Sequence, residues 1–431
     1  MRVYVLSKSG APLMPCHPAR ARQMLREGRA VVHRTTPFVI RLKDRSEGDT
    51  QPVLLKFDPG SKTTGIALVR QEPSGDQAVL NLMELAHRGH QISEALTARR
   101  QMRRRRRSNL RYRAPRFLNR GNKPQGWIAP SLEHRVDTAM AWAHRLQRWA
   151  PIVAISSELV RFDMQAMDNP EIEGAQYQQG TLAGYEVREY LLEKWARQCA
   201  YCAAKDTPLQ IDHIQPKARG GSNRISNLTL ACRCCNEAKA AQPIEAFLAK
   251  KPDVLRRILA QAKRPLKDAA AVNATRWELV KQLRSTGLPV EMASGGRTKF
   301  NRLRLEVPKT HALDAACVGT FGSLLHWKQP TLRIKCTGRG SYQRTRLTKH
   351  GFPRGYLMRS KQVHGFQTGD LVKAQVPHGK KAGAYKGRIA VRASGSFNIQ
   401  TGNGVVQGIS YRHCSLIQRG DGYGYLMQPI D

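Results

Sequence analysis

Two Cys-x-x-Cys pairs separated by a short polar segment constrain the fold of this chain more than any other sequence feature. The pairs are Cys199 with Cys202 and Cys232 with Cys235. Four thiolates can close a tetrahedral Zn²⁺ site at about 2.3 Å per bond, and a closed all-sulfur site leaves no open position for a substrate. We therefore expect one structural zinc ion, with any chemistry carried by the residues between the pairs.

The segment between the cysteine pairs contains residues suited to phosphodiester hydrolysis. Asp212 and His213 end a short apolar run, Asn227 follows a Gly-Gly turn, and a helix is expected to begin at Asn236. Asp212 and Asn236 could hold one Mg²⁺ while His213, on the other side of the strand, serves as general base. Asn227 would brace the loop that presents His213. A zinc ribbon without catalysis would explain the cysteines but not the Asp-His pair.

This spacing resembles that of HNH nucleases, in which two strands and a helix form a ββα-metal unit. Asp212, His213, Asn227 and Asn236 fall on the positions of that motif, with Asn in place of the last His. The resemblance implies that this part of the chain is a nuclease.

The overall charge points to a polyanionic partner. The 431 residues include 72 Lys and Arg against 32 Asp and Glu, which gives a formal net charge of +40. So many positive charges repel one another, and a nucleic acid partner would offset that repulsion better than a membrane surface would. The N-terminal residues have no apolar signal core, and cysteines gathered at a metal site favour the reducing cytoplasm over a disulfide scaffold.

Three further stretches place acidic residues at the ends of predicted elements. Asp58 follows an apolar strand over 53–57, and Glu158 ends another over 152–155. His311 and Asp314 share one face of a predicted helix. Each stretch alone is more typical of a turn or a surface pair, but together they could hold two Mg²⁺ ions about 4 Å apart for in-line cleavage.

The order of these four residues resembles the motifs of RuvC-like nucleases with the RNase H fold. The HNH-like stretch lies between Glu158 and His311. We therefore expect one nuclease inserted into another. A helix over 131–149 is expected to pack in the RuvC-like core, and a helix over 185–195 is expected to lead into the HNH insert.

An arginine-rich segment separates Asp58 from Glu158, and no acidic residue occurs between Ala95 and Leu132. It predicts a helix that contacts a phosphate backbone, although a disordered basic arm is the alternative. A second basic stretch, over 295–302, is predicted to be a Gly-led loop that contacts phosphate. The candidate nucleic-acid-binding residues are Arg99, Arg100, Arg103, Arg104, Arg105, Arg106, Arg107, Arg111, Arg113, Arg116, Arg297, Lys299 and Arg302.

The two ends of the chain predict smaller modules. Residues 1–52 predict an α/β cap with strands over 3–6 and 30–33, a Pro-Leu-Met-Pro corner over 12–15 and a helix over 18–26. Residues 331–431 contain few acids and many glycines between short alternating runs, which favours a small antiparallel β-barrel-like module that binds rather than catalyses.

In this order the parts resemble IscB, a family of transposon-associated RNA-guided DNA endonucleases related to CRISPR effectors. The fold expected is a multidomain α/β chain with an RNase H-like (RuvC) core split by an HNH insert. The expected domains are a cap (1–52), three RuvC-like parts (53–92, 121–184 and 251–330), an arginine-rich bridge helix (93–120), the HNH nuclease with its zinc knuckles (185–250) and a C-terminal module (331–431).

The resemblance implies a monomeric protein in a ribonucleoprotein that acts on duplex DNA at the nucleoid of a prokaryotic cell. A guide RNA, called ωRNA in this family, would pair with one DNA strand while the protein reads a short flanking motif. The HNH site, with one Mg²⁺, would cut the paired strand, and the RuvC-like site, with two Mg²⁺ and ligands Asp58, Glu158, His311 and Asp314, the displaced strand.

Two alternatives remain open. One is a protein-only nuclease specific for a DNA structure or site, which would stay active after RNase treatment. The other is a nucleic-acid-binding module without catalysis, against which the intact acidic, His and Asn positions argue.

Overall fold

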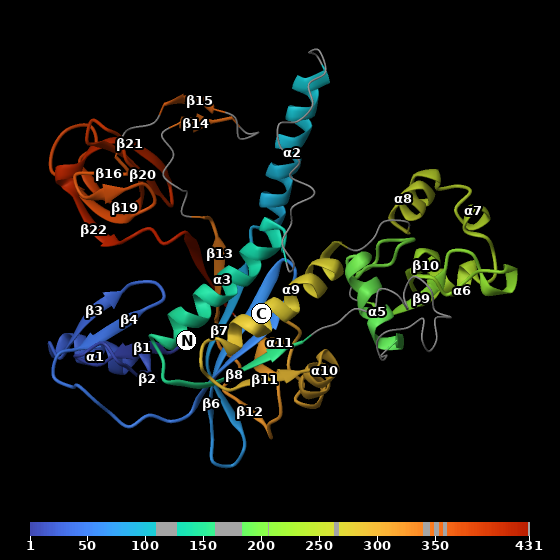
Figure 1. Cartoon of the computed structure of the whole chain (residues 1–431), viewed down its shortest axis with the longest axis horizontal. Helices are drawn as coiled ribbons and strands as arrows, with labels where there is room; N and C mark the ends of the chain where they lie inside the picture. Colours follow the sequence, from blue (N-terminus) through green and yellow to red (C-terminus); the bar gives the residue numbers. More distant parts are fainter. Residues whose placement is uncertain are drawn as a thin grey trace. The chain divides into compact units, whose positions relative to one another are not determined.

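The computed structural model describes residues 1–108, 127–159, 183–205, 207–262, 267–338, 345–348, 353–356 and 360–429 (Figure 1). The chain divides into two compact units. The larger combines Met1–Leu159 with Thr275–Asp431, and the smaller is Val160–Ala274. The smaller unit is therefore an insertion in the chain of the larger one.

A sheet of eight strands is the centre of the larger unit. Its order is β11-β8-β5-β6-β7-β13-β23, with β12 also paired to β7. Strands β5, β6 and β7 are antiparallel neighbours, whereas β8 and β11 run parallel to β5. The strands are β5 (Val53–Pro59), β6 (Thr63–Gln71), β7 (Gln77–Ala86), β8 (Ile152–Glu158), β11 (Val290–Ala293), β12 (Leu324–Leu325), β13 (Thr331–Cys336) and β23 (Tyr423–Gln428).

Helices cover both faces of this sheet. Successive residues of a strand point to opposite faces, so β6 packs Ile66 and Leu68 into one core and Ala67 and Val69 into another. The first core includes α3 (Pro130–Gln147) and α9 (Lys267–Arg284), and the second includes α11 (His311–Ala316). The expected packing helix over 131–149 is thus α3, with Val136, Met140, Ala143 and Leu146 buried.

The N-terminal cap is a four-stranded sheet of order β2-β1-β4-β3 with one helix. Its elements are β1 (Val3–Leu6), β2 (Pro12–Cys16), α1 (Pro18–Arg26), β3 (Ala30–Arg34) and β4 (Val39–Leu42). The Pro-Leu-Met-Pro segment, expected to be a corner, is strand β2 instead. Proline is tolerated there because β2 lies at the sheet edge, where half of the backbone N–H groups need no partner.

The C-terminal segment contributes to two sheets. Strands β13 and β23 pair with each other and β13 pairs with β7, so both belong to the central sheet rather than to a separate module starting at 331. Between them, β18 (Leu371–Val376), β19 (Gly383–Ala390), β20 (Ser396–Thr401), β21 (Gly404–Ser410) and β22 (Cys414–Gln418) form an antiparallel sheet. Short paired strands precede it: β14 (Thr345–Leu347) with β15 (Pro353–Tyr356), and β16 (Gln362–Val363) with β17 (Phe366–Gln367).

The five-stranded sheet is open rather than a barrel. Its order is β21-β20-β19-β18-β22, and among the described residues the edge strands β21 and β22 do not pair with each other. One face is closed by a small apolar core that includes Val372, Phe397 and Ile399. Alternating strands and glycine turns fit an open sheet as well as a barrel, so the sequence pattern could not distinguish the two.

The smaller unit is built on a two-stranded antiparallel sheet and several helices. It contains α5 (Ala183–Lys194), β9 (Leu209–His213), β10 (Leu228–Cys232), α6 (Arg233–Lys239), α7 (Ile244–Phe247) and α8 (Pro252–Ala262). Its core includes Tyr190, Trp195, Leu230 and, from α8, Ile258. Residues 252–262 therefore pack with this unit, although the sequence placed the boundary at 250.

Candidate functional sites

One candidate site gathers the acidic residues of the central sheet. Asp58 lies near the end of β5, Glu158 ends the neighbouring parallel strand β8, and Asp314 lies in the first turn of α11. Parallel neighbours bring their carboxyl ends to the same edge of a sheet, which is why residues a hundred positions apart meet here. Asp58 and Asp314 lie close enough to Glu158 for their charges to raise the pKa of its carboxyl group.

Helix α11 is seated on the sheet through a glycine. Gly65 in β6 pairs with Asp58 in β5, and a Cβ atom on Gly65 would lie 1.7 Å from the carbonyl oxygen of His311. Only a residue without a side chain allows this approach. The hydroxyl of Thr310 accepts a hydrogen bond from Leu313 N–H and caps the helix at the same point.

Two of the acids, Glu158 and Asp314, lie in surroundings that disfavour their charged forms. Burial, followed by the charge of Asp58, raises the pKa of Glu158 to about 8 and that of Asp314 to about 6. A divalent cation beside Glu158 and Asp314 would favour their ionised forms through its charge. Carboxylate oxygens are ligands that Mg²⁺ accepts, but no three of these side chains place their ligand atoms within 4.8 Å of one another, the spacing that the four cysteines reach.

His311 and Arg302 make ion pairs with two of these acids. His311 Nδ1 lies 3.1 Å from Asp58 Oδ2, and the carboxylate raises the pKa of the imidazole. Since an ionised carboxylate only accepts, Nδ1 is the donor and only Nε2 is left for another ligand. Arg302 Nε lies 3.0 Å from Asp314 Oδ1, so this arginine, expected to contact phosphate, neutralises an acid of the site.

The stretch over 295–302, expected to be a loop, is a helix, α10 (Gly295–Arg304). Ser294 caps it by accepting a hydrogen bond from Arg297 N–H. The two glycines occupy its first turn, where backbone N–H groups have no partner within the helix, so they signal a helix start as readily as a loop. Arg297 is exposed and Lys299 half-buried on this helix.

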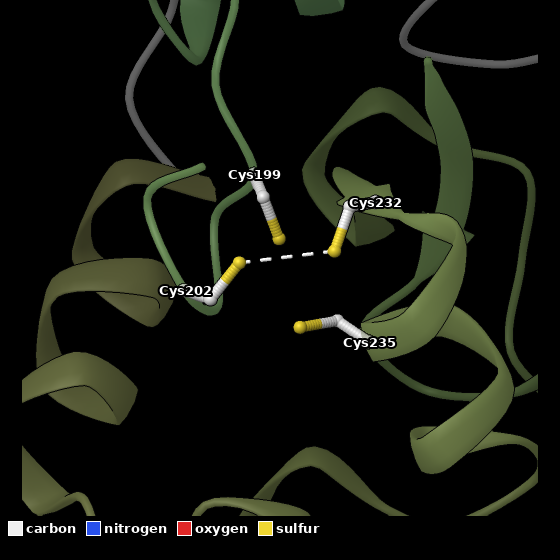
Figure 2. A group of neighbouring side chains, drawn as sticks. All are labelled: Cys199, Cys202, Cys232 and Cys235. Carbon is white, nitrogen blue, oxygen red and sulfur yellow. Dashed lines mark hydrogen bonds between the residues drawn. The ribbon is translucent and has the colours of Figure 1, made fainter. Parts of the chain in front are cut away.

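The second candidate site is the four-cysteine cluster of the smaller unit. Figure 2 shows the side chains of Cys199 and Cys202 from one loop facing those of Cys232 and Cys235 from the start of α6. The four sulfur atoms all lie within 4.8 Å of one another, the only such cluster of three or more possible ligands among the described residues. Cys202 and Cys232 Sγ are 3.7 Å apart. This matches the edge of a tetrahedron with bonds of about 2.3 Å, so the cluster fits zinc.

The third candidate site lies on β9 beside this cluster. Asp212 is buried while the next residue, His213, is half-buried on the other side of the strand. Asp212 accepts hydrogen bonds from the Tyr201 hydroxyl and from Lys239 Nζ, the latter at 3.2 Å. A carboxylate offers about four lone-pair directions, so capacity remains for a cation. His213 Nε2 lies 3.0 Å from Asn223 Oδ1.

The two asparagines of the motif have different surroundings. Asn227 fastens the loop after His213: its Oδ1 accepts from Gln215 N–H, and its Nδ2 donates to the Gln215 and Ser222 carbonyls. Asn236 Nδ2 donates to Gln210 Oε1 at 2.7 Å. Helix α6 begins at Arg233 rather than at Asn236, since Cys235 already lies in its first turn, and Asn236 faces β9 from within the helix.

The arginine-rich segment is helical as far as the structure describes it. Helix α2 (Gly89–Ser108) carries exposed Arg100, Arg103, Arg104, Arg105 and Arg106, with Arg99 half-buried. The backbone at Arg107 belongs to the same helix. Arg111, Arg113 and Arg116 lie outside the described residues.

Sequence reasoning missed several residues that touch these sites. Lys239 is fully buried and bonds both Asp212 and the His213 carbonyl, and Thr298 hydrogen-bonds Glu158. Glu84, which pairs with Gly65 in the sheet, adds to the field that raises the pKa of His311. Only Lys239 could have been found from the sequence, because it lies one helical turn after Asn236 and so on the same face of the predicted helix.

Two family models match the chain. Residues 3–180 match the family described as RRXRR protein, and residues 199–242 match HNH endonuclease. The second match covers the four cysteines together with β9, β10 and α6. The chain carries an HNH endonuclease domain. Within this domain lie Asp212, His213, Asn227 and Asn236, the residues that the sequence motif had singled out.

Solved structures show a distant similarity. The Type II-C Cas9 enzyme from Actinomyces naeslundii is 14% identical with a TM-score of 0.23, and the match covers 62% of this chain and 59% of that one. Streptococcus thermophilus Cas9 in complex with the AGAA PAM is 10% identical with a TM-score of 0.22, over 61% of this chain and 32% of that one. The match thus spans less than two thirds of either enzyme, 59% of the first and 32% of the second. No curated protein matches the sequence.

Among the described helices, none combines the length and the apolar character needed to span a bilayer.

Proposed function

We propose that this chain is an RNA-guided endonuclease that cuts both strands of DNA with two separate active centres. The observation that carries the proposal is the placing of Asp58, Glu158 and Asp314 at one edge of the central sheet, in a chain that also holds an HNH domain. The sheet runs β7-β6-β5 antiparallel and then β8 and β11 parallel. This order supports an RNase H-like, RuvC-type core, as the IscB resemblance implies.

In the HNH domain, His213 is the general base for the attacking water. Asn223 at Nε2 and Lys239 at the His213 carbonyl fix the ring and its backbone. Asp212 and Asn236 would hold a Mg²⁺ that, when bound, stabilises the charge developing on the phosphate. Asn227 keeps the loop beside His213 in place.

In the RuvC-like centre, the carboxylates of Asp58, Glu158 and Asp314 would hold two Mg²⁺, which together stabilise the attacking and leaving oxygens. His311 orients Asp58 through Nδ1. Arg302 holds Asp314 in place. His311 is thus an orienting group rather than a metal ligand through Nδ1.

A guide RNA would account for the positive charge that lies outside the two active centres. The exposed arginines of α2 and the formal net charge of +40 suit a structured RNA as well as the DNA target. By the IscB resemblance the guide is an ωRNA, the HNH domain cuts the guide-paired strand, and the C-terminal five-stranded sheet binds RNA or the flanking motif. The alternative is a protein-only nuclease. RNase treatment before the cleavage assay distinguishes the two proposals, because a protein-only nuclease would stay active and an RNA-guided one would not.

Strand-labelled duplex DNA, co-purified RNA and Mg²⁺ test the division of labour. His213→Ala should reduce the first cut by about 100-fold, the typical effect of removing a general base. Asp58→Ala should abolish the second cut, and the double variant should bind without cutting. If either single substitution abolishes both cuts, the two centres are not independent and the proposal is wrong.

The salt dependence of RNA binding tests α2. Replacing Arg103 to Arg107 by Gln removes up to five cations that can neutralise phosphates, so the slope of log K against log[salt] should fall by roughly 0.9 for each phosphate no longer neutralised. Filter binding of the co-purified RNA between low and high salt measures it. Arg256→Gln, on the exposed face of α8, is a single-charge control that should leave the slope almost unchanged. An unaltered slope in the α2 variant would remove this helix from the RNA interface.

A further inference from the structure

The loop that carries the first cysteine pair reaches into the HNH site. Tyr201 lies between Cys199 and Cys202 in the sequence and is 4% exposed. Its hydroxyl donates a hydrogen bond to Oδ2 of Asp212, the buried acid on β9. An ionised carboxylate can only accept, so the tyrosine is the donor. One side chain therefore connects the four-cysteine cluster with an acid of the HNH motif.

The position of Tyr201 is fixed from two sides. Ala200 N–H, in the same loop, donates to the carbonyl of Leu230 in β10 at 2.8 Å, and β10 is paired with β9. The ring of Tyr201 packs edge-on against Phe247 of α7, with the ring centroids 5.3 Å apart. The loop and the acid are thus held on one two-stranded sheet, so the hydroxyl meets Asp212 from a defined direction.

Asp212 is held at both of its oxygen atoms. Lys239 Nζ lies 3.2 Å from Oδ1, and the Tyr201 hydroxyl bonds Oδ2. A carboxylate held in this way cannot rotate about its Cβ–Cγ bond without breaking a hydrogen bond, so its remaining lone pairs keep one direction. Of these two donors, Tyr201 is the one that belongs to the loop of the first cysteine pair. A movement of that loop would therefore turn the carboxylate.

We propose that Tyr201 is a positioning residue of the HNH centre, through which the loop of the four-cysteine cluster orients the carboxylate of Asp212 for its cation. The inference rests on the proposed function, in which Asp212 is a Mg²⁺ ligand, and gives this loop a second role beside supplying two cysteines. A metal ion held by Cys199 and Cys202 would restrain the loop on both sides of Tyr201. Removing a hydrogen-bond partner of a metal ligand typically costs about 10- to 100-fold in metal affinity or activity.

Tyr201→Phe tests the inference, because it removes the hydroxyl and keeps the ring that packs against Phe247. In the guide-loaded protein, the Mg²⁺ concentration that gives half of the maximal rate of the HNH cut should rise about tenfold. Fe²⁺ supplied in place of Mg²⁺, with ascorbate and hydrogen peroxide, cleaves the polypeptide beside the bound ion, and scission near Asp212 should need about tenfold more Fe²⁺ in the variant. Co²⁺ bound by the four cysteines should give the same thiolate absorption in both proteins, because the variant leaves the cluster intact.

Thr229→Val is the matched control. Thr229 pairs with Asp212 across the two strands, and its buried hydroxyl makes no hydrogen bond within the part of the chain that the structure describes. This variant should keep the Mg²⁺ dependence of the unaltered protein. An unchanged Mg²⁺ dependence in Tyr201→Phe, or a changed cobalt spectrum, overturns the inference. An HNH cut that survives Asp212→Asn counts instead against the proposed function.

Discussion

His87 is a buried residue near the acidic site whose charge state differs from its ordinary one. Its Nε2 lies 2.8 Å from the Thr64 hydroxyl, and burial, followed by the charge of Arg135, lowers its pKa to about 3. The native state therefore holds His87 neutral over a range in which the unfolded chain binds a proton. Stability is fully present above the unfolded pKa of about 6.5 and is lost as the pH falls toward 3.

We expect the melting temperature to fall with decreasing pH below about 6.5, and His87→Gln to make this fall shallower, because glutamine has no proton to bind. Thermal denaturation of both proteins from pH 7 to pH 4 measures the slopes. His378→Gln, at an exposed position of the C-terminal segment, is the control and should keep the original slope. Parallel curves for His87→Gln and the unaltered protein would contradict the expectation.

At the scale of elements, the close packing of α11 on β6 determines the position of Asp314 relative to the other two acids. Gly65→Ala would place a Cβ atom 1.7 Å from the His311 carbonyl oxygen, so the helix must move by more than 1 Å. A displacement of that size typically costs about 100-fold in rate. The cut assigned to the acidic site should fall by at least that much.

The HNH cut should persist in Gly65→Ala, because that centre lies in the other unit. Gly48→Ala is the matched control, since its nearest contact would be an ordinary 3.6 Å. Strand-labelled cleavage reports both cuts in one assay. A fully active Gly65→Ala would show that α11 does not carry a residue of the site.

Local signals were sufficient to predict several elements. Helix α1 has Pro at its start and Gly28 past its end, and the strands that lead into Asp58 and Glu158 begin as apolar runs. Helix α10 was missed because its Ser294 cap was outweighed by two glycines. Strand β2 was missed because its prolines are harmless only at an edge, and edge position depends on distant partners.

The same limit applies within the sites. The sequence identified the acids and the cysteines by type and spacing, but not the partners that set their charge. Whether Arg302 meets a phosphate or Asp314 depends on packing between α10 and α11, and the burial of Lys239 against Asp212 depends on α6 folding over β9. Pairing of β13 with β23 likewise joins segments that no local pattern connects.

At the scale of the whole molecule, the four-cysteine cluster and the acidic site belong to different compact units. The small sheet of the HNH domain has two strands, too few to be stable without further support. A closed zinc site supplies such support as folding free energy. Loss of zinc should therefore unfold the HNH domain while the larger unit stays folded.

Treatment with a strong zinc chelator should release one zinc ion per chain and abolish the HNH cut. The cut at the acidic site should return once excess Mg²⁺ is restored. Cys235→Ser should behave in the same way without chelator, whereas Cys234→Ser, at the exposed neighbouring cysteine outside the cluster, should be neutral. Metal analysis and strand-labelled cleavage check this; zinc-free protein with both cuts intact would exclude a structural role for the cluster.

The insertion of the smaller unit after β8 fixes the order in which the acidic site is completed during synthesis. Asp58 and Glu158 leave the ribosome first, then all of Val160–Ala274, and only then Asp314. The arginines of α2 precede all but the first of these acids, so, on the proposed function, a nascent chain would bind RNA before its acidic centre is complete. A translation product cut short before α11 would therefore carry the arginines of α2 but lack Asp314, so its acidic centre would be incomplete.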